Sequence, residues 1–213
     1  MNKNEKYVIT INRELGSGGR TVGELLAKKL GVSFYDKAVI KTLEERYNLT
    51  TKEIEKFRDR KDSWWDDFKR IANIGDGLAR NNYTNAEMRR KFDVLTTENV
   101  FQVETEILQE IAEKESCVIA GRCGFFMFRN HPNHLRIFIQ APLSFRVSRL
   151  INKRGMTQEE ALNLIERVDI KRENYVKKFT GTSRYDTRNY DLVINAENKT
   201  EDKIVQQILN FMD

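Results

Sequence analysis

The apolar positions along the chain follow two alternating periods. Short runs rich in β-branched residues predict buried strands, and apolar residues three or four positions apart predict amphipathic helices between them. The expected strands are 7–11, 32–36, 117–121, 135–139 and 192–194, and the expected helices are 22–30, 142–153, 157–179 and a last one starting at 200. This alternation predicts an α/β domain with a parallel sheet of about five strands and helices on both faces.

The stretch from 37 to about 115 interrupts the alternation with an almost wholly helical pattern. It is highly charged around Trp64 and Trp65, and Gly75 and Gly77 mark a turn within it. We therefore expect a single domain, 1–213, that carries a helical insert over a site. The tryptophans lie among basic residues and would suit base stacking, but packing within the insert or across a homodimer is their more ordinary use.

Bulk composition narrows the class of protein. A chain of 213 residues supports one α/β core without disulfides. Its net charge of +5 arises from 37 basic and 32 acidic side chains, an excess too dispersed to indicate a nucleic-acid partner by itself. Cys117 and Cys123 suit a reducing compartment, and no apolar run is long enough to span a membrane. We expect a cytoplasmic protein with no membrane partner.

A glycine-rich segment joins the first expected strand to the first expected helix. Backbone N–H groups at such a junction, with the positive end of the helix dipole, attract phosphate oxygens. Arg20 and Thr21 resemble the lysine and hydroxyl pair of a P-loop, so Arg20 would neutralise phosphate charge and Thr21 would bind Mg²⁺. The segment predicts ATP as ligand, and its phosphate cradle is Gly16, Ser17, Gly18, Gly19, Arg20 and Thr21.

Two departures from the P-loop pattern qualify this prediction. Glu14 stands where a glycine is usual, and Arg20 stands where a lysine is usual. Arginine keeps the positive charge but follows a moving γ-phosphate less readily than a lysine ammonium. The same glycines could also serve only as a tight strand-to-helix turn. The segment therefore supports phosphate binding more securely than catalysis.

Four stretches, 9–20, 34–37, 119–122 and 190–195, resemble the cytidylate kinase-like family, which is related to bacterial cytidylate kinases. The resemblance spans nearly the whole chain, and an arginine at position 20 is typical of this branch. It implies a three-layer P-loop kinase fold, with an acceptor-binding insert at about 37–115 and a lid at about 154–180. It also implies transfer of the γ-phosphoryl group of ATP, with Mg²⁺, to a nucleoside monophosphate.

The resemblance carries roles for two residues at strand ends, where open α/β sheets bind ligands. Asp36 and Arg122 would face the acceptor nucleotide. Asp36 would serve equally well as the cap of a helix beginning at Lys37, and Arg122 could form a surface salt bridge instead. Cys123 stands where cytidylate kinases commonly have aspartate, which leaves the acceptor open.

The implied lid region supplies candidate catalytic arginines, because positive charge stabilises the transferring phosphoryl group. Arg149, Arg154 and Arg167 are the preferred members, with Arg20 from the glycine-rich segment. A solvated helix face with acid-base pairs is the alternative for each one. A non-catalytic nucleotide-binding regulator, or a kinase for another small-molecule acceptor, would use the same fold.

Two further groups have ordinary interpretations. His131 and His134 have no third ligand at a matching spacing, so we expect exposed loop histidines and no metal site. The apolar run 125–128 follows a strand and is expected to fill core.

Overall fold

The structure is a computed structural model, and it describes residues 1–36, 97–121 and 123–213. Most of the expected insert lies outside these residues. The chain divides into two compact units, Met1–Tyr35 with Ile111–Asp213, and Asp36–Glu110. The described elements are β1 Val8–Arg13, α1 Gly19–Leu30, β2 Ser33–Asp36, α6 Thr97–Lys114, β3 Cys117–Ala120, α7 Gly124–Met127, β4 His134–Gln140, α8 Leu143–Arg154, α9 Gln158–Thr180, η1 Thr187–Asn189, β5 Leu192–Asn195 and α10 Glu201–Met212.

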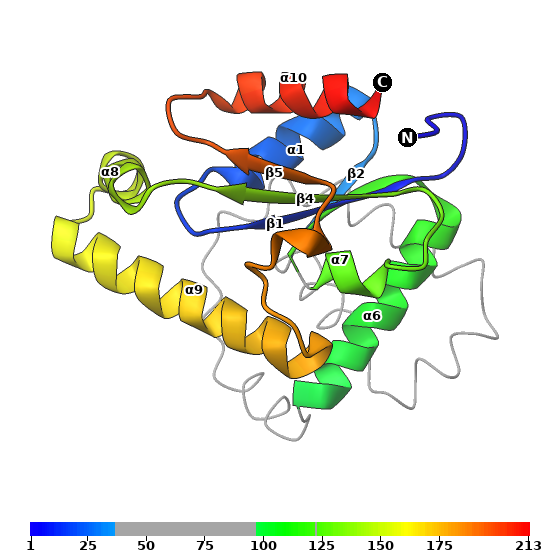
Figure 1. The fold of residues 1–213 in the computed structure, drawn as a ribbon, viewed down its shortest axis with the longest axis horizontal. Coiled ribbons are helices and arrows are strands. Elements are labelled where there is room, and N and C mark those ends of the chain that lie inside the picture. Colours follow the sequence, from blue (N-terminus) through cyan, green and yellow to red (C-terminus); the bar gives the residue numbers. More distant parts are fainter. Residues whose placement is uncertain (37–96, 122) are drawn as a thin grey trace, which may run out of the picture. The chain divides into compact units, whose positions relative to one another are not determined.

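The strands form one five-stranded parallel sheet in the order β2-β3-β1-β4-β5. β1 lies at the centre, where Val8 pairs with Cys117 of β3 on one side and with His134 of β4 on the other. β5 extends the sheet beyond β4. Figure 1 shows α1 and α10 on one side of the sheet and α7 on the other. The predicted α/β class, with a parallel sheet of about five strands and helices on both faces, is confirmed.

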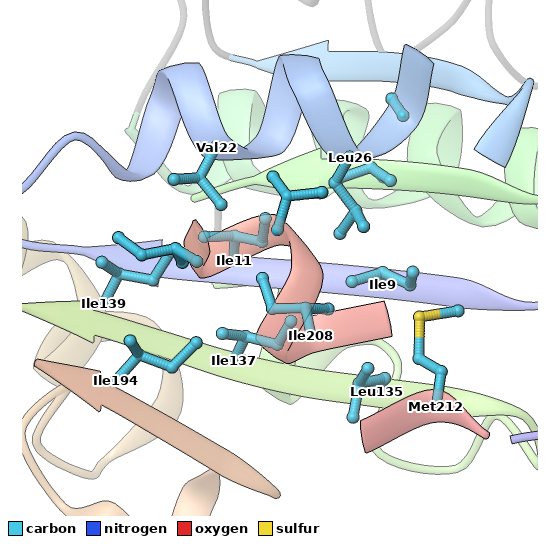
Figure 2. Packing of buried hydrophobic residues seen from close by; sticks show 14 of the residues in the cluster. Ile9, Ile11, Val22, Leu26, Leu135, Ile137, Ile139, Ile194, Ile208 and Met212 are labelled. Carbon is cyan, nitrogen blue, oxygen red and sulfur yellow. The ribbon is translucent and has the colours of Figure 1, made fainter. Parts of the chain in front are cut away.

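The main core fills the space between the sheet and the α1–α10 pair. Successive residues of a strand point to opposite faces, so Ile9 and Ile11 enter this core while Thr10 points away from it. Val22 and Leu26 come from α1 and Ile208 from α10, and Figure 2 shows these side chains packed over the strands. This packing fixes where β1 ends and α1 begins.

The opposite face is covered by α7 and by the segment before β5. The ring of Tyr190 stacks on Phe138 with centroids 5.1 Å apart and lies 5.4 Å from Phe125. Phe125 and Phe128 are buried, as the apolar run predicted. Gly124 packs against Thr10, and a methyl group on it would lie 2.8 Å from the Thr10 Cγ2 atom. This contact brings α7 close to the sheet.

His134 corrects one expectation. It is the first residue of β4 rather than a loop residue, and it is half-buried. Its Nδ1 lies 2.9 Å from the Phe128 carbonyl oxygen, so Nδ1 carries the proton and Nε2 accepts from the Thr10 hydroxyl at 2.8 Å. Burial lowers the pKa of His134 to about 4. The histidine therefore acts as a neutral strand residue.

The helix ends follow local sequence. Thr157 and Glu160 form a reciprocal capping box at the start of α9, and the Thr200 hydroxyl accepts from the Lys203 N–H at the start of α10. Gly31 ends α1 in the left-handed conformation, directly after the helix end expected at residue 30. None of the helices among the described residues combines the length and the apolar character needed to cross a membrane.

Candidate functional site

The glycine loop, residues 14–18, connects the end of β1 to the start of α1. Gly18 is the N-cap residue of α1 and has φ 86°, a conformation that glycine adopts without a steric penalty. The first helical hydrogen bond runs from the Val22 N–H to the Gly18 carbonyl. In the first turn of any α-helix the backbone N–H groups point out of the helix start rather than to a carbonyl of the preceding turn. This helix start has the geometry of an anion-binding site.

Glu14 anchors the glycine loop to the neighbouring strand. Its N–H donates to the Ile139 carbonyl at 3.1 Å, and its Oε2 accepts from the Ala141 N–H at 3.0 Å. Its own carbonyl accepts from the Ser17 hydroxyl at 3.0 Å. A glycine has no carboxylate with which to reach Ala141. This contact gives a structural reason for glutamate at a position where P-loops usually have glycine.

Helix α8 packs directly on the glycine loop. A methyl group at Gly16 would lie 2.9 Å from the Arg146 Cβ, so the two backbones can approach only because Gly16 has no side chain. A methyl group at Gly18 would lie 3.2 Å from Arg149 Nη2 and 3.3 Å from its Cζ. The Arg149 guanidinium therefore lies over the glycine that caps α1.

The other candidate catalytic arginines are Arg20 in the first turn of α1, Arg154 at the end of α8 and Arg167 on α9. The Arg20 Nη1 is 2.7 Å from the Glu24 Oε1, one turn further along α1, and both side chains are well exposed. Arg154 is exposed at the end of α8, and Arg167 is exposed on α9. Arg149 is the candidate catalytic arginine whose guanidinium the structure places over the loop. Thr21 is half-buried in the first turn of α1, beside the same helix start.

A cluster of paired charges supports the loop from α9. The Asp169 carboxylate accepts from the Leu15 N–H at 3.1 Å and from Arg146 Nη1 at 2.6 Å. Arg184 Nη1 lies 3.5 Å from the same carboxylate, and Arg172 Nη1 lies 3.7 Å from it. One buried carboxylate thus connects the loop, α8, α9 and the segment that follows α9.

Two guanidinium groups of this cluster also donate to one carbonyl. Arg172 Nη1 lies 3.2 Å from the Arg13 oxygen, and Arg184 Nη2 donates to the same atom. Burial lowers the pKa of Arg172, and the nearby Arg184 charge lowers it further. Arg184 is fully buried, with its guanidinium carbon 5.1 Å from the Tyr185 ring centroid. These contacts join the segment before β5 to the residue that precedes the loop.

The sequence did not identify Arg184 and Arg13, whose contacts support the loop and the end of β1. Arg184 follows Gly181 in a turn with no periodicity to mark it. Arg13 ends β1, and its guanidinium lies against Gly121, where an added Cβ would clash with Arg13 Nη1. The Arg13 side chain therefore lies across the carboxyl ends of β1 and β3. An arginine closing a buried strand was the available signal, by the strand-end rule.

The structure describes one of the two residues that are expected to face the acceptor. Asp36 is the last residue of β2 and is buried. Its roles as acceptor ligand and as helix cap both stay predictions, because the helix expected at Lys37 lies outside the described residues. Arg122 also lies outside them.

The residues near the loop suit magnesium only together with phosphate oxygens. Among residues 1–36, 97–121 and 123–213, no cluster of three or more histidine, cysteine, aspartate or glutamate side chains could hold a metal ion. The Thr21 hydroxyl is an oxygen ligand of the kind that Mg²⁺ uses beside phosphates. A magnesium ion here would thus depend on a bound nucleotide.

A groove of about 510 Å³ between α8 and α9 borders the charge cluster that supports the loop, and its lining mixes apolar and polar side chains. It is lined by Leu143, Leu162 and Ile170. It also includes Arg146 and Asp169, whose charged groups already pair with each other. The loop, and not this groove, is the candidate site.

Comparisons with known proteins agree with the arrangement. Residues 8–198 match the sequence model of the Cytidylate kinase-like family. A cytidylate kinase from Sulfolobus acidocaldarius is 24% identical over 206 residues, which cover 96% of this chain and 93% of that protein.

Two solved structures share the fold. A protein from Eubacterium ventriosum superposes with a TM-score of 0.68 at 21% identity, covering 98% of this chain and 99% of the other. Shikimate kinase from Bacteroides thetaiotaomicron gives a TM-score of 0.51 at 18% identity, covering 97% and 98%. The architecture is therefore the three-layer α/β fold of P-loop kinases.

Proposed function

The chain belongs to the Cytidylate kinase-like family, and from this premise we propose that it transfers the γ-phosphoryl group of ATP to a nucleoside monophosphate. The observation that carries the proposal is the start of α1. There Gly18 caps the helix in the left-handed conformation, and the Arg149 guanidinium lies over it. The N–H groups of a helix start and a cation fixed at the same point suit a triphosphate.

The proposed mechanism relies on positioning and charge, because phosphoryl transfer asks little covalent chemistry of the protein. The backbone N–H groups of residues Gly16 to Gly19, at the end of the glycine loop and the start of α1, cradle the phosphates. Arg20 leaves its exposed partner Glu24 and contacts the β- and γ-phosphates, and Arg149 contacts the donor from α8. Magnesium, when bound, supplies further neutralisation of phosphate charge, and the Thr21 hydroxyl would hold it.

The lid completes the proposal. Arg154 and Arg167 are exposed on α8 and α9, so closure of the segment at about 154–180 can deliver them to the transferring group. Closure would also exclude water from the reacting phosphate, which strengthens every charge interaction there. Asp36 and Arg122 would hold the acceptor. The insert at about 37–115 would complete the acceptor site within a single kinase domain.

Cytidylate is the proposed acceptor, because the relative from Sulfolobus acidocaldarius is a cytidylate kinase. A coupled assay of ADP formation with ATP, Mg²⁺ and each nucleoside monophosphate in turn tests this. We expect turnover that requires the acceptor and is fastest with CMP. Purified protein that binds ATP but forms no ADP with any nucleoside monophosphate would reject the proposal.

A kinase acting on another small molecule is a second candidate. Fold neighbours include shikimate kinases, and Cys123 replaces the aspartate common in cytidylate kinases. A thermal-shift panel with ATP and Mg²⁺ separates the acceptors, because a true acceptor raises the melting temperature by mass action.

A non-catalytic nucleotide-binding regulator is the third candidate. Its support is Arg20, which pairs with Glu24 rather than facing the loop. ATP-dependent closure without any product would favour it. The cytoplasmic location also stays a proposal, and the thiol side chains of Cys117 and Cys123 are buried, as a reducing compartment allows.

A further inference from the structure

Helix α10 contributes one carboxylate to the candidate site. Glu201 is the first residue of α10, directly after the capping residue Thr200. Its Oε1 accepts hydrogen bonds from Arg149 Nη2 and, at 3.3 Å, from Lys153 Nζ. Arg149 and Lys153 are one turn apart on α8. A single carboxylate therefore binds both cations on the face of α8 that meets α10.

The Arg149–Glu201 pair is shielded from water. The side chains of Arg149 and Glu201 are 18% and 23% exposed, whereas Lys153 is 56% exposed. Burial raises the pKa of Glu201, but the hydrogen bonds from Arg149, Lys153 and the backbone, together with the Arg149 charge, outweigh burial, so the pKa lies below its ordinary value. Glu201 is thus ionised at neutral pH and forms a charge-assisted hydrogen bond.

The same guanidinium lies against the glycine loop. A methyl group at Gly18 would lie 3.2 Å from Arg149 Nη2, 3.3 Å from Cζ and 3.6 Å from Nε. Nη2 is also the atom that donates to Glu201. The guanidinium is therefore confined between the carboxylate of α10 and the N-cap residue of α1.

We propose that Glu201 is a positioning residue, which holds Arg149 over the helix start where the donor phosphates bind. This inference rests on the proposed function. Arginine has many rotamers in solution, and ordering them when a ligand binds costs free energy. Glu201 orders the side chain beforehand. Because Arg149 and Lys153 share the one carboxylate, the group keeps a net positive charge toward phosphate.

The location of Glu201 excludes a simpler role. A glutamate in the first turn of a helix interacts favourably with the helix dipole without any other partner. Asp202 places the same charge in the same turn. The Asp202 side chain is 73% exposed and lies 3.9 Å from Lys29, away from α8. Asp202→Asn is therefore a matched control for Glu201→Gln.

The test measures the dissociation constant of Mg-ATP by calorimetry without acceptor, and then KM and kcat with CMP. We expect E201Q to raise both the dissociation constant and KM for ATP about tenfold, the effect of one charge-assisted hydrogen bond. Its kcat should stay within about twofold of the wild-type value, because the weakened contact binds ATP equally well in the ground state and in the transition state. D202N should bind ATP within about twofold of the wild type.

A double-mutant cycle with Arg149 assigns the effect. In the R149M background, E201Q should weaken ATP binding no further. An equal loss in that background, or an equal loss in D202N, would overturn the positioning role. If thermal melting shows that E201Q does not fold, E201A replaces it, and unchanged ATP affinity in E201A would also overturn the role.

The outcome for the wild type separates the two proposals. Wild-type protein that binds no Mg-ATP rejects the proposed function and the role of Glu201 with it. Wild-type protein that binds and turns over ATP, with E201Q indistinguishable from it, rejects the role of Glu201 alone.

Discussion

At the scale of single residues, the partner of each arginine decides what it can do. Arg20 and Glu24 form an exposed pair on one helix, and such pairs contribute between about 0 and 1 kcal/mol. Arg20 can therefore leave Glu24 for a phosphate at little cost. Arg149 pairs with Glu201 in a partly buried place and needs no such rearrangement.

Replacing Arg20 tests its share of the chemistry. R20A should lower kcat/KM for ATP about 100-fold or more, since a cation aimed at the transferring group is lost. R20K keeps the charge and should retain more activity than R20A. E24Q should stay within about threefold of the wild type, because it removes only the exposed partner. An R20A variant with wild-type kcat/KM would contradict the proposed contact.

His134 gives the stability of the protein a defined pH dependence. Its pKa is lowered to about 4 by burial, against about 6.5 in an unfolded chain. Between these values the unfolded state binds more protons, so the stability contributed by neutral His134 is complete above about pH 6.5 and declines as pH falls toward 4. The loss should be about 3 kcal/mol by pH 4.

Urea unfolding of the wild type and of H134Q at pH 7 and pH 4.5 checks this sign. Other titrating groups act in both proteins, including the nearby Asp191. The difference in unfolding free energy between wild type and H134Q should therefore shift against the wild type at the lower pH. A difference independent of pH would refute the assignment.

At the scale of elements, local sequence predicted most helix and strand ends. Thr157, Thr200 and Gly31 mark ends that the structure confirms. The short helix α7 was not predicted, because four residues carry too little periodicity. It depends on the contact between Gly124 and Thr10, which are distant in sequence. Tertiary contact, rather than propensity, forms such a turn.

Asp169 holds α9 against the glycine loop, and D169N tests that connection. The variant leaves the buried Arg146 and Arg184 guanidinium groups without their common carboxylate. Breaking a buried ion pair on one side costs about 3 to 5 kcal/mol, and Glu14, 3.6 Å from Arg146, offsets part of this. We expect a loss of about 2 to 3 kcal/mol in urea unfolding.

E166Q is the matched control, because Glu166 is exposed on the same helix. Its unfolding free energy should change by less than about 0.5 kcal/mol. If D169N were as stable as E166Q, the charge cluster would not be what holds α9 to the loop.

At the scale of the whole molecule, the alternation of strands and helices predicted the parallel sheet and the loop at the end of β1. Alternation does not specify which strands are neighbours, so the order β2-β3-β1-β4-β5 came from the structure. The burial of Arg184 and the pairing of Glu201 with Arg149 join segments far apart in the chain. No local pattern carries such contacts. The catalytic roles of Arg20, Arg149, Arg154 and Arg167, the phosphate-binding role of 16–21, the metal-binding role of Thr21 and the acceptor roles of Asp36 and Arg122 all stay predictions.

The most direct test of phosphoryl transfer follows the γ-phosphate itself. Wild-type protein is mixed with ATP labelled at the γ-phosphate, Mg²⁺ and CMP, and the products are separated by chromatography. R149M serves as the variant with a weakened site. We predict labelled CDP from the wild type and much less from R149M at the same ATP concentration. Label that remains in ATP, or appears only as inorganic phosphate, while ATP binding is retained, would contradict transfer to CMP.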